Sequence, residues 1–290
     1  MTIDTAQQTI AANGIDICYQ DHGDPAHPVI LLIMGLGGQL TLWPVELVDA
    51  LVAKGFRVVR YDNRDIGLST TFDAAGVPNV RRLALRSLFR MELRVPYRIA
   101  DMARDAVGLL DALGIERAHI VGASMGGMIA QHVAASHGAR VLSLTSVMST
   151  SGNRRLPRPK KAAMALLFDR PTGGDPEAII AFSKRAAKVI GSPAYPPDPE
   201  RLDRRIRADF ARSFRPQGLA RQMAAIIADG DRRPLLRRIT APTLVIHGEA
   251  DPLAPIAGGH DTAANIDDAA FLAIPGMGHD LPLALVDTMA

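Results

Sequence analysis

The chain contains a serine, an aspartate and a histidine, in that order, that could act as a nucleophile, an acid and a base. Ser124 is at the centre of GASMG, residues 122–126, which has the pattern G-x-S-x-G. By composition alone such a pattern arises about once in ten chains of this size, so its surroundings must support it. A serine hydroxyl needs a nearby base that is itself oriented by an acid. Asp251 and His279, further along the chain, are the candidates for these roles.

The segments on either side of Ser124 predict a sharp strand-to-helix turn. Residues 118–122 are short and apolar, whereas 123–137 have helical spacing. In a nucleophile elbow, this arrangement holds the serine in a strained backbone conformation at the end of a sheet. Gly122 and Gly126 would let two backbone segments pass closely. A serine that merely packs in a glycine turn needs no such context, so we predict that Ser124 is the nucleophile.

The candidate acid and base each follow a predicted strand. Residues 242–248 precede Asp251, and residues 269–276 precede His279. Open α/β sheets build their sites on loops at the carboxyl ends of parallel strands, and the order serine, acid, histidine is that of the elbow proteins. We therefore predict that His279 is the base and that Asp251 orients it.

Other residues compete for these roles. Glu249 lies closer to the strand end than Asp251, whereas Asp280 is expected to be a loop residue. The chain has eight histidines. Those other than His279 are expected to be structural residues in or at the end of strands (His119 and His247), or loop and helix-surface residues (His22, His27, His132, His137 and His260).

The stretch MGLGGQL, residues 34–40, is the candidate oxyanion loop. The expected donors are the backbone N–H of Leu36 and that of Met125, directly after Ser124. Glycines in this stretch, Gly35 among them, would let the loop fold tightly beside the reacting carbonyl. A dinucleotide site is disfavoured, because GLGGQLTLW lacks the G-x-G-x-x-G spacing and no acidic ribose ligand follows.

Residues 61–70, YDNRDIGLST, follow another predicted strand. Asp62, Arg64 and Ser69 are expected to form a hydrogen-bonded brace under the site, with a structural rather than a catalytic role. Trp43, the only tryptophan, either lines the pocket or packs in the core.

The elements that must position these residues alternate between strands and helices. Two N-terminal strands are joined at Asn13-Gly14, a pair favoured in tight hairpin turns. Strands are then predicted at 29–35, 56–62, 118–122, 140–148, 242–248 and 269–276, and helices at 44–54, 98–113 and 123–137. This alternation is typical of an α/β fold with a mostly parallel central sheet and helices on both faces.

A long segment interrupts the alternation. Residues 151–233 contain no convincing strand, are rich in Arg and Pro, and include the loop SPAYPPDPE between helical patterns. We predict an α/β core formed by residues 1–150 and 234–290, and an inserted helical cap formed by residues 151–233.

The composition fits one large domain of 290 residues, 48% hydrophobic and 22% charged, with a net charge of +3. Arginine-rich runs at 154–161, 201–207 and 232–238 are expected to be solvated faces, because a nucleic-acid footprint would interleave aromatics and these are only 4% here. Cys18, the single cysteine, excludes an intramolecular disulfide and a Cys-rich metal site, and is expected in a buried strand. Neither a signal peptide nor a membrane span is evident, so a soluble, cytoplasmic protein is predicted.

The motifs resemble the α/β-hydrolase superfamily along nearly the whole chain, and in particular the aclacinomycin methylesterase group and related bacterial carboxylesterases. The likeness is carried by IMGLGGQLTLWP, RYDNRDIGLST, HIVGASMGGMIAQ, APTLVIHGEADPLAP and IPGMGHDLP. It implies an α/β-hydrolase fold and a serine esterase that cleaves a small-molecule ester, with no metal, organic cofactor or nucleic-acid partner. Many relatives begin the oxyanion loop with His-Gly. This chain, like the methylesterase group, has methionine there (Met34), which leaves the backbone donor in place.

Other activities fit the same residues. Dehalogenases and most epoxide hydrolases of this fold carry a carboxylate at the elbow, which Ser124 argues against. Cofactor-free perhydrolases, lactonases and carbon–carbon bond hydrolases share the triad and are alternatives to a carboxylesterase. A ligand-binding protein on a hydrolase scaffold is an alternative of a different class, against which the intact triad and oxyanion loops argue.

Overall fold

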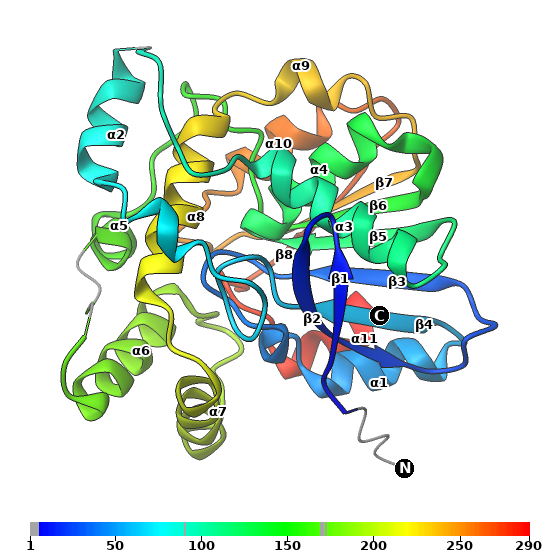
Figure 1. Ribbon diagram of the computed structural model, residues 1–290, viewed down its shortest axis with the longest axis horizontal. Coiled ribbons are helices and arrows are strands. Elements are labelled where there is room, and N and C mark those ends of the chain that lie inside the picture. Colours follow the sequence, from blue (N-terminus) through cyan, green and yellow to red (C-terminus); the bar gives the residue numbers. More distant parts are fainter. Residues whose placement is uncertain (1–5, 90, 169–170, 172) are drawn as a thin grey trace.

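The computed structural model describes residues 6–89, 91–168, 171 and 173–290 (Figure 1). These residues form an eight-stranded sheet in the order β1-β2-β4-β3-β5-β6-β7-β8. Strand β2 is antiparallel to both of its neighbours, whereas the strands from β4 to β8 are parallel. The strands are β1 (Gln8–Ala12), β2 (Ile15–His22), β3 (Val29–Ile33), β4 (Arg57–Tyr61), β5 (Ala118–Ala123), β6 (Val141–Val147), β7 (Thr243–Gly248) and β8 (Ala270–Ile274).

The N-terminal hairpin follows from its turn residues. Asn13 and Gly14 both have positive φ, 49° and 75°, as the two central residues of a tight hairpin turn require. Ala12 pairs with Ile15 across the turn. The predicted hairpin is confirmed, and Cys18 is buried in its second strand with a free thiol, as expected.

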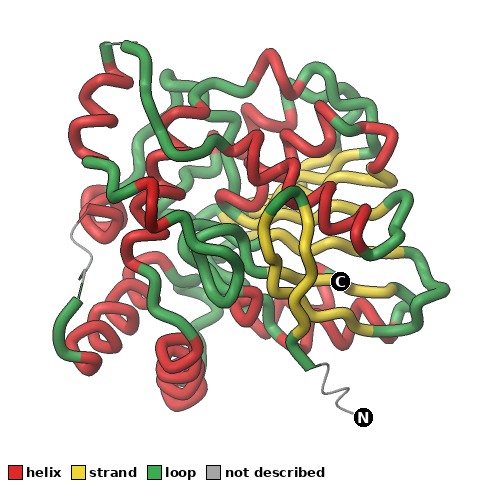
Figure 2. The backbone as a smooth tube through the Cα atoms, in the orientation of Figure 1, coloured by secondary structure: helices red, strands yellow, loops and turns green. Residues whose placement is uncertain are grey.

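Helices cover both faces of the sheet. In Figure 2 the yellow strands lie between red helices. On one face lie α3 (Ile99–Ala112), α4 (Met125–Ser136) and α10 (Ala257–Ala263), and on the other α1 (Val45–Ala53) and α11 (Val286–Met289). Each face has its own cluster of buried side chains. All of β3 is buried, because a central parallel strand is covered from both sides. The predicted parallel sheet with helices on both faces is therefore confirmed.

Between β6 and β7 the described residues form helices and no strand. These are α5 (Lys161–Phe168), α6 (Pro176–Ile190), α7 (Pro199–Arg212), α8 (Pro216–Asp229) and the short α9 (Arg233–Leu236). Helices α5 to α8 gather at one side of the sheet, on the left in Figure 1. They are joined there by α2 (Val80–Leu88), which the sequence did not predict and which packs against α8. The helical character expected of this segment is confirmed, whereas its role as a separate cap stays a prediction.

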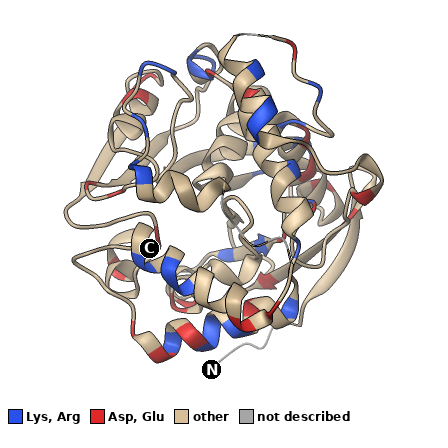
Figure 3. Ribbon diagram, turned by 90° about the vertical axis from the view of Figure 1, so that its left-hand side faces the viewer, with Lys and Arg blue, Asp and Glu red and all other residues tan. Residues whose placement is uncertain are grey.

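Positions of positively and negatively charged residues are interspersed along the ribbon on this side of the molecule (Figure 3). On α7, Arg201 pairs with Glu46 at 2.7 Å, and Arg207 with Glu177 at 2.5 Å. The solvated face expected for 201–207 is therefore an ion-paired one. For Arg232 the expectation was wrong, because this side chain is buried and bonds Asp229 at 2.6 Å. In the part of the chain that the structure describes, no helix is both long and apolar enough to span a membrane.

The crossing of β5 and α4 over the first buried strand depends on two glycines. A Cβ on Gly126 would lie 1.9 Å from the carbonyl oxygen of Ile33, and a Cβ on Gly122 would lie 2.1 Å from the carbonyl oxygen of Gly126. Both distances are far below van der Waals contact, and both atoms belong to backbone that cannot move aside. The close backbone approach predicted from G-x-S-x-G is confirmed.

Gly126→Ala is expected to destabilise the fold by at least about 3 kcal/mol, because overpacking against backbone forces the elbow away from β3. Gly138→Ala is the matched control, two residues beyond the C-terminal end of α4, where an added Cβ meets nothing within 4 Å. Its effect should stay within about 1 kcal/mol. Urea unfolding followed by circular dichroism measures both, and equal midpoints for the two variants would refute the argument.

Candidate active site

Ser124 lies between the last residue of β5 and the first residue of α4, in the backbone conformation of an elbow. Its φ is 56° and its ψ is −118°, a strained combination for a residue with a side chain. The Ser124 N–H donates to the carbonyl of Val147 at 2.9 Å, which ties the turn to the neighbouring strand. The strained conformation predicted for this serine is confirmed.

Ser124, His279 and Asp251, which are far apart in the sequence, meet in one hydrogen-bonded chain. Ser124 Oγ lies 3.0 Å from His279 Nε2, and His279 Nδ1 lies 2.7 Å from Asp251 Oδ2. An ionised carboxylate can only accept hydrogen bonds, so the proton of a neutral His279 is on Nδ1. Nε2 is then left as an acceptor for the Ser124 hydroxyl proton, as a general base requires.

The Asp251 carboxylate is buried in the loop that follows β7. Its Oδ1 accepts hydrogen bonds from the N–H groups of Leu253 and Ala254, both at 2.8 Å. Burial alone would raise the pKa of Asp251. The charge of a protonated His279, the nearby His247 ring, and hydrogen bonds from His279 and the Ala254 N–H outweigh burial and hold that pKa well below its usual range. The competing Glu249 is exposed, so the geometry favours Asp251 as the acid.

His247 stabilises the turn that holds Asp251. It is a structural residue on a strand, as the sequence predicts. The ring is fully buried. Its Nε2–H donates to the carbonyl of Ala254 at 2.7 Å, and the same nitrogen lies 3.6 Å from Asp251 Oδ2. The ring therefore steadies the turn whose N–H groups hold Asp251. The sequence signal was a histidine on the strand that leads into the acid's loop.

The loop that carries His279 is held by the last residue of α6 and the segment after it, which the sequence did not reveal. The His279 N–H donates to the carbonyl of Ile190 at 2.7 Å. Ser192 Oγ accepts from the N–H of Gly278 at 2.8 Å and donates to the Asp280 carboxylate. Burial raises the pKa of Asp280 despite this bond. The position of the candidate base thus depends on residues from the helical segment between β6 and β7.

The candidate oxyanion loop passes directly over Ser124. A Cβ on Gly35 would lie 2.9 Å from the Cβ of Ser124, so only glycine permits this approach. Met125 is the first residue of α4, where an N–H has no acceptor within the helix. The N–H of Leu36 donates to no acceptor within the described residues. Both expected donors therefore belong to backbone that adjoins the serine.

The residues predicted to form a brace separate into two groups. Ser69 Oγ donates to the carbonyl of Asp62 at 2.7 Å, and the Asp62 carboxylate accepts from the N–H of Leu40 at 2.7 Å. Arg64 does not join them, because it binds Asp105 on α3 through two hydrogen bonds of 2.5 and 2.6 Å. Asn63, which we did not single out, donates to the carbonyl of Met34 at 2.8 Å. The brace therefore consists of Asp62, Asn63 and Ser69.

Trp43 and His22 both pack inside the protein. Trp43 is 1% exposed and belongs to the buried cluster on the α1 face, which favours its packing role. His22 was expected in a loop, but it is the last residue of β2 and is buried. That expectation was wrong because the strand continues further than its polar sequence indicates. Over the ranges that the structure describes, no group of three or more His, Cys, Asp or Glu side chains could hold a metal ion.

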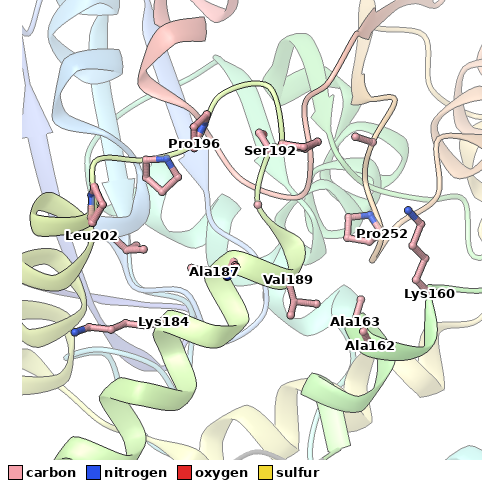
Figure 4. Close-up of a pocket in the computed structure, with 16 residues that line it drawn as sticks. Lys160, Ala162, Ala163, Lys184, Ala187, Val189, Ser192, Pro196, Leu202 and Pro252 are labelled. Atoms are coloured by element: carbon pink, nitrogen blue, oxygen red, sulfur yellow. The ribbon is translucent and has the colours of Figure 1, made fainter.

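A cavity of about 730 Å³ lies between α5, α6 and the loop after β7 (Figure 4). Its walls are mostly apolar, with lysine side chains at Lys160, Lys184 and Lys188. Ala250 and Pro252, which flank Asp251, line it, whereas Ser124 and His279 do not. The cavity therefore lies behind the acid's loop and does not by itself define where a reacting carbonyl would bind.

Comparisons with known proteins find relatives that match nearly the whole chain. The chain is 32% identical over 292 residues to the rhodomycin D methylesterase of Streptomyces sp. (strain C5), covering 92% of this chain and 90% of that protein. It is 26% identical over 256 residues to the 3-oxoadipate enol-lactonase 2 of Acinetobacter baylyi, covering 87% and 82%. The solved enol-lactonase from Burkholderia xenovorans LB400 superposes with a TM-score of 0.71 at 26% identity, covering 97% of this chain and 96% of that one.

Membership of a family rests on the extent of the match and not on the elbow alone. Residues 28–283 match the family described as alpha/beta hydrolase fold, which takes in the oxyanion loop, the elbow and the loops of Asp251 and His279. The resemblance inferred from the motifs is confirmed, and the chain belongs to the α/β-hydrolase fold family.

Proposed function

We propose that this protein is a serine hydrolase that cleaves carboxylic esters through an acyl-enzyme intermediate. The observation that carries the proposal is the continuous hydrogen-bonded chain from Ser124 Oγ to His279 to Asp251, with distances of 3.0 and 2.7 Å. The similarity to a rhodomycin D methylesterase supports an ester as the substrate class.

In the proposed acylation, Ser124 Oγ attacks the ester carbonyl carbon as His279 Nε2 takes the hydroxyl proton. The carbonyl π electrons move to the oxygen, and the N–H groups of Leu36 and Met125 stabilise the resulting oxyanion. When the tetrahedral intermediate collapses, the bond to the alcohol oxygen breaks and His279 returns the proton to that oxygen. The acyl group stays on Ser124. Asp251 remains ionised and stabilises the imidazolium.

Deacylation repeats these steps with water as the nucleophile. His279 takes a proton from water, the hydroxide oxygen bonds to the acyl carbon, and the bond to Ser124 Oγ breaks as His279 protonates Oγ. The products are an acid and an alcohol. We propose in addition that α5 to α8 form a cap over this site, and that the cap sets the preference for acyl and alcohol groups.

A lactone is the second candidate substrate, because the chain is similar to two enol-lactonases. A lactone is a cyclic ester, so the proposed steps apply unchanged, and only the leaving alcohol stays attached to the acid. The two substrate classes differ in the shape that the cap must admit and make the same demands on Ser124, His279 and Asp251.

Hydrolysis of p-nitrophenyl esters from acetate to decanoate, alongside a five-membered enol lactone, tests the proposal. We expect measurable turnover that a fluorophosphonate abolishes, with the added mass located on the peptide that contains Ser124. If turnover falls steeply as the acyl chain lengthens while the enol lactone is still hydrolysed, a lactone is favoured as the substrate class. Absence of turnover on every substrate, together with no labelling of Ser124, would favour a binding protein on a hydrolase scaffold.

A further inference from the structure

A glutamine from α8 bonds directly to the oxyanion loop. Gln222 is fully buried. Its Oε1 accepts from the N–H of Gly37 at 2.9 Å, and its Nε2 donates to the carbonyl of Arg64 at 2.9 Å. Both halves of the side-chain amide are thus satisfied, one by the oxyanion loop and one by the segment after β4. A buried amide with both partners in place holds them at a defined separation.

The bond to Gly37 falls at the centre of a tight turn. The N–H of Gly38 donates to the carbonyl of Gly35 at 3.1 Å, which closes a four-residue turn with Gly37 in third place. Gly37 has a φ of 68°, as the third residue of a type II turn requires. Gln222 provides an acceptor for its N–H, which lies in the middle of the turn. This peptide plane shares the Cα of Leu36 with the plane that carries the expected oxyanion donor.

The helix that carries Gln222 is seated closely on the segment after β4. Arg221, which is 1% exposed, donates to the Asp65 carboxylate through bonds of 2.9 and 2.7 Å. A Cβ on Gly218 would lie 2.1 Å from the carbonyl oxygen of Asp65. Gly218, Arg221 and Gln222 are three or four residues apart or adjacent, so they share one face of the helix. The helix therefore cannot slide without losing these contacts, which hold the backbone of Gln222 in a defined position.

We infer that Gln222 is a positioning residue for the oxyanion loop, and that α8 contributes through it to the rate of the chemical step. The inference rests on the proposed function and deepens it. Asn63 and Asp62 hold the same loop at Met34 and Leu40 from the β4 side, whereas Gln222 holds it between these points from the helical segment. Removing an oxyanion donor lowers kcat by about 10²- to 10³-fold. Misplacing one should cost somewhat less, on the order of 10- to 100-fold.

Gln222→Met, Gln222→Glu and Ile226→Ala test the inference. Methionine keeps the length and removes both hydrogen bonds, whereas glutamate keeps an acceptor for the Gly37 N–H. Ile226, on the same helix, packs against the buried cluster of the α3 face, so its truncation loosens α8 and leaves the hydrogen bonds of the loop in place. Rates on p-nitrophenyl acetate are divided by the concentration of sites that a fluorophosphonate titrates, which removes the contribution of unfolded protein. Amide exchange of the peptide covering 34–42 is measured in parallel.

For Gln222→Met we expect kcat to fall 10- to 100-fold with KM nearly unchanged, and exchange in 34–42 to become faster. Gln222→Glu should retain more kcat than Gln222→Met, because glutamate keeps an acceptor for the Gly37 N–H. If packing alone mattered, the buried carboxylate would be the worse substitution and this order would be reversed. Ile226→Ala should lower the unfolding midpoint while keeping kcat within about 3-fold. An active wild type whose Gln222→Met variant keeps full kcat would overturn the inference and leave the proposed function standing. A wild type inactive on every ester and lactone would overturn the proposed function itself.

Discussion

Replacing Ser124 by alanine is expected to lower kcat/KM for p-nitrophenyl acetate by a factor of about 10³ or more. The substitution removes only Oγ, which lies 3.0 Å from His279 Nε2, and so deletes the atom that would bond to the carbonyl carbon. The proposed oxyanion donors, the N–H groups of Leu36 and Met125, stay in place and should leave a small residual rate above that of water. Because alanine meets the same backbone strain as serine at a φ of 56°, the unfolding midpoint should change little.

Ser136→Ala is the matched control for this prediction. Ser136 is the exposed last residue of α4, so its loss should leave kcat/KM unchanged within about 2-fold. A Ser124→Ala protein that keeps more than one tenth of the wild-type rate, once contaminating esterases are excluded by fluorophosphonate titration, would remove Ser124 from the mechanism.

Asp251→Asn is expected to lower kcat by about 10⁴-fold with the fold intact. The amide oxygen of asparagine can still accept from the Leu253 and Ala254 N–H groups, which preserves the loop. Its NH₂ group can donate to His279 Nδ1, and the neutral ring would then carry its proton on Nε2. That tautomer donates to Ser124 Oγ and cannot accept its proton. The negative charge that stabilises the imidazolium is lost as well.

The pH dependence of the wild-type protein provides a second readout of the role of Asp251. The pKa of Asp251 is lowered in the folded protein, so the carboxylate is charged over the whole range in which an esterase is assayed. The acid limb of wild-type activity should therefore not be due to protonation of Asp251. Its stabilising effect on the fold should likewise persist above its unfolded pKa, near 3.9, and disappear only as the pH falls through the lower folded value.

Glu249→Gln is the control that separates the two candidate acids. Glu249 is exposed, and we expect its replacement to change kcat by less than about 2-fold. If the rate losses of the two variants were interchanged, Glu249 would be the acid and the interpretation of the loop after β7 would be wrong.

Much of the fold follows from signals that act over a few residues. The hairpin at Asn13-Gly14 depends on two residues that tolerate positive φ, and the parallel strands on short apolar runs between helical patterns. The elbow is equally local, because Gly122, Ser124 and Gly126 are part of one turn. The helix α2 was missed although its sequence is amphipathic, because it is short and rich in arginine, and only one of its residues, Leu83, is buried.

Local signals in the sequence thus specify the sheet, the elbow and the chain order of Ser124, Asp251 and His279. Which side chains meet depends on the packing of the folded chain, because such contacts are set by where strands far apart in the sequence end. Asp251 rather than Glu249 faces His279, and Arg64 turns from the brace to Asp105 on α3. Gln222 reaches Gly37 across 185 positions of sequence. A polar residue on the buried face of a helix signals that it has a partner, but packing alone selects that partner.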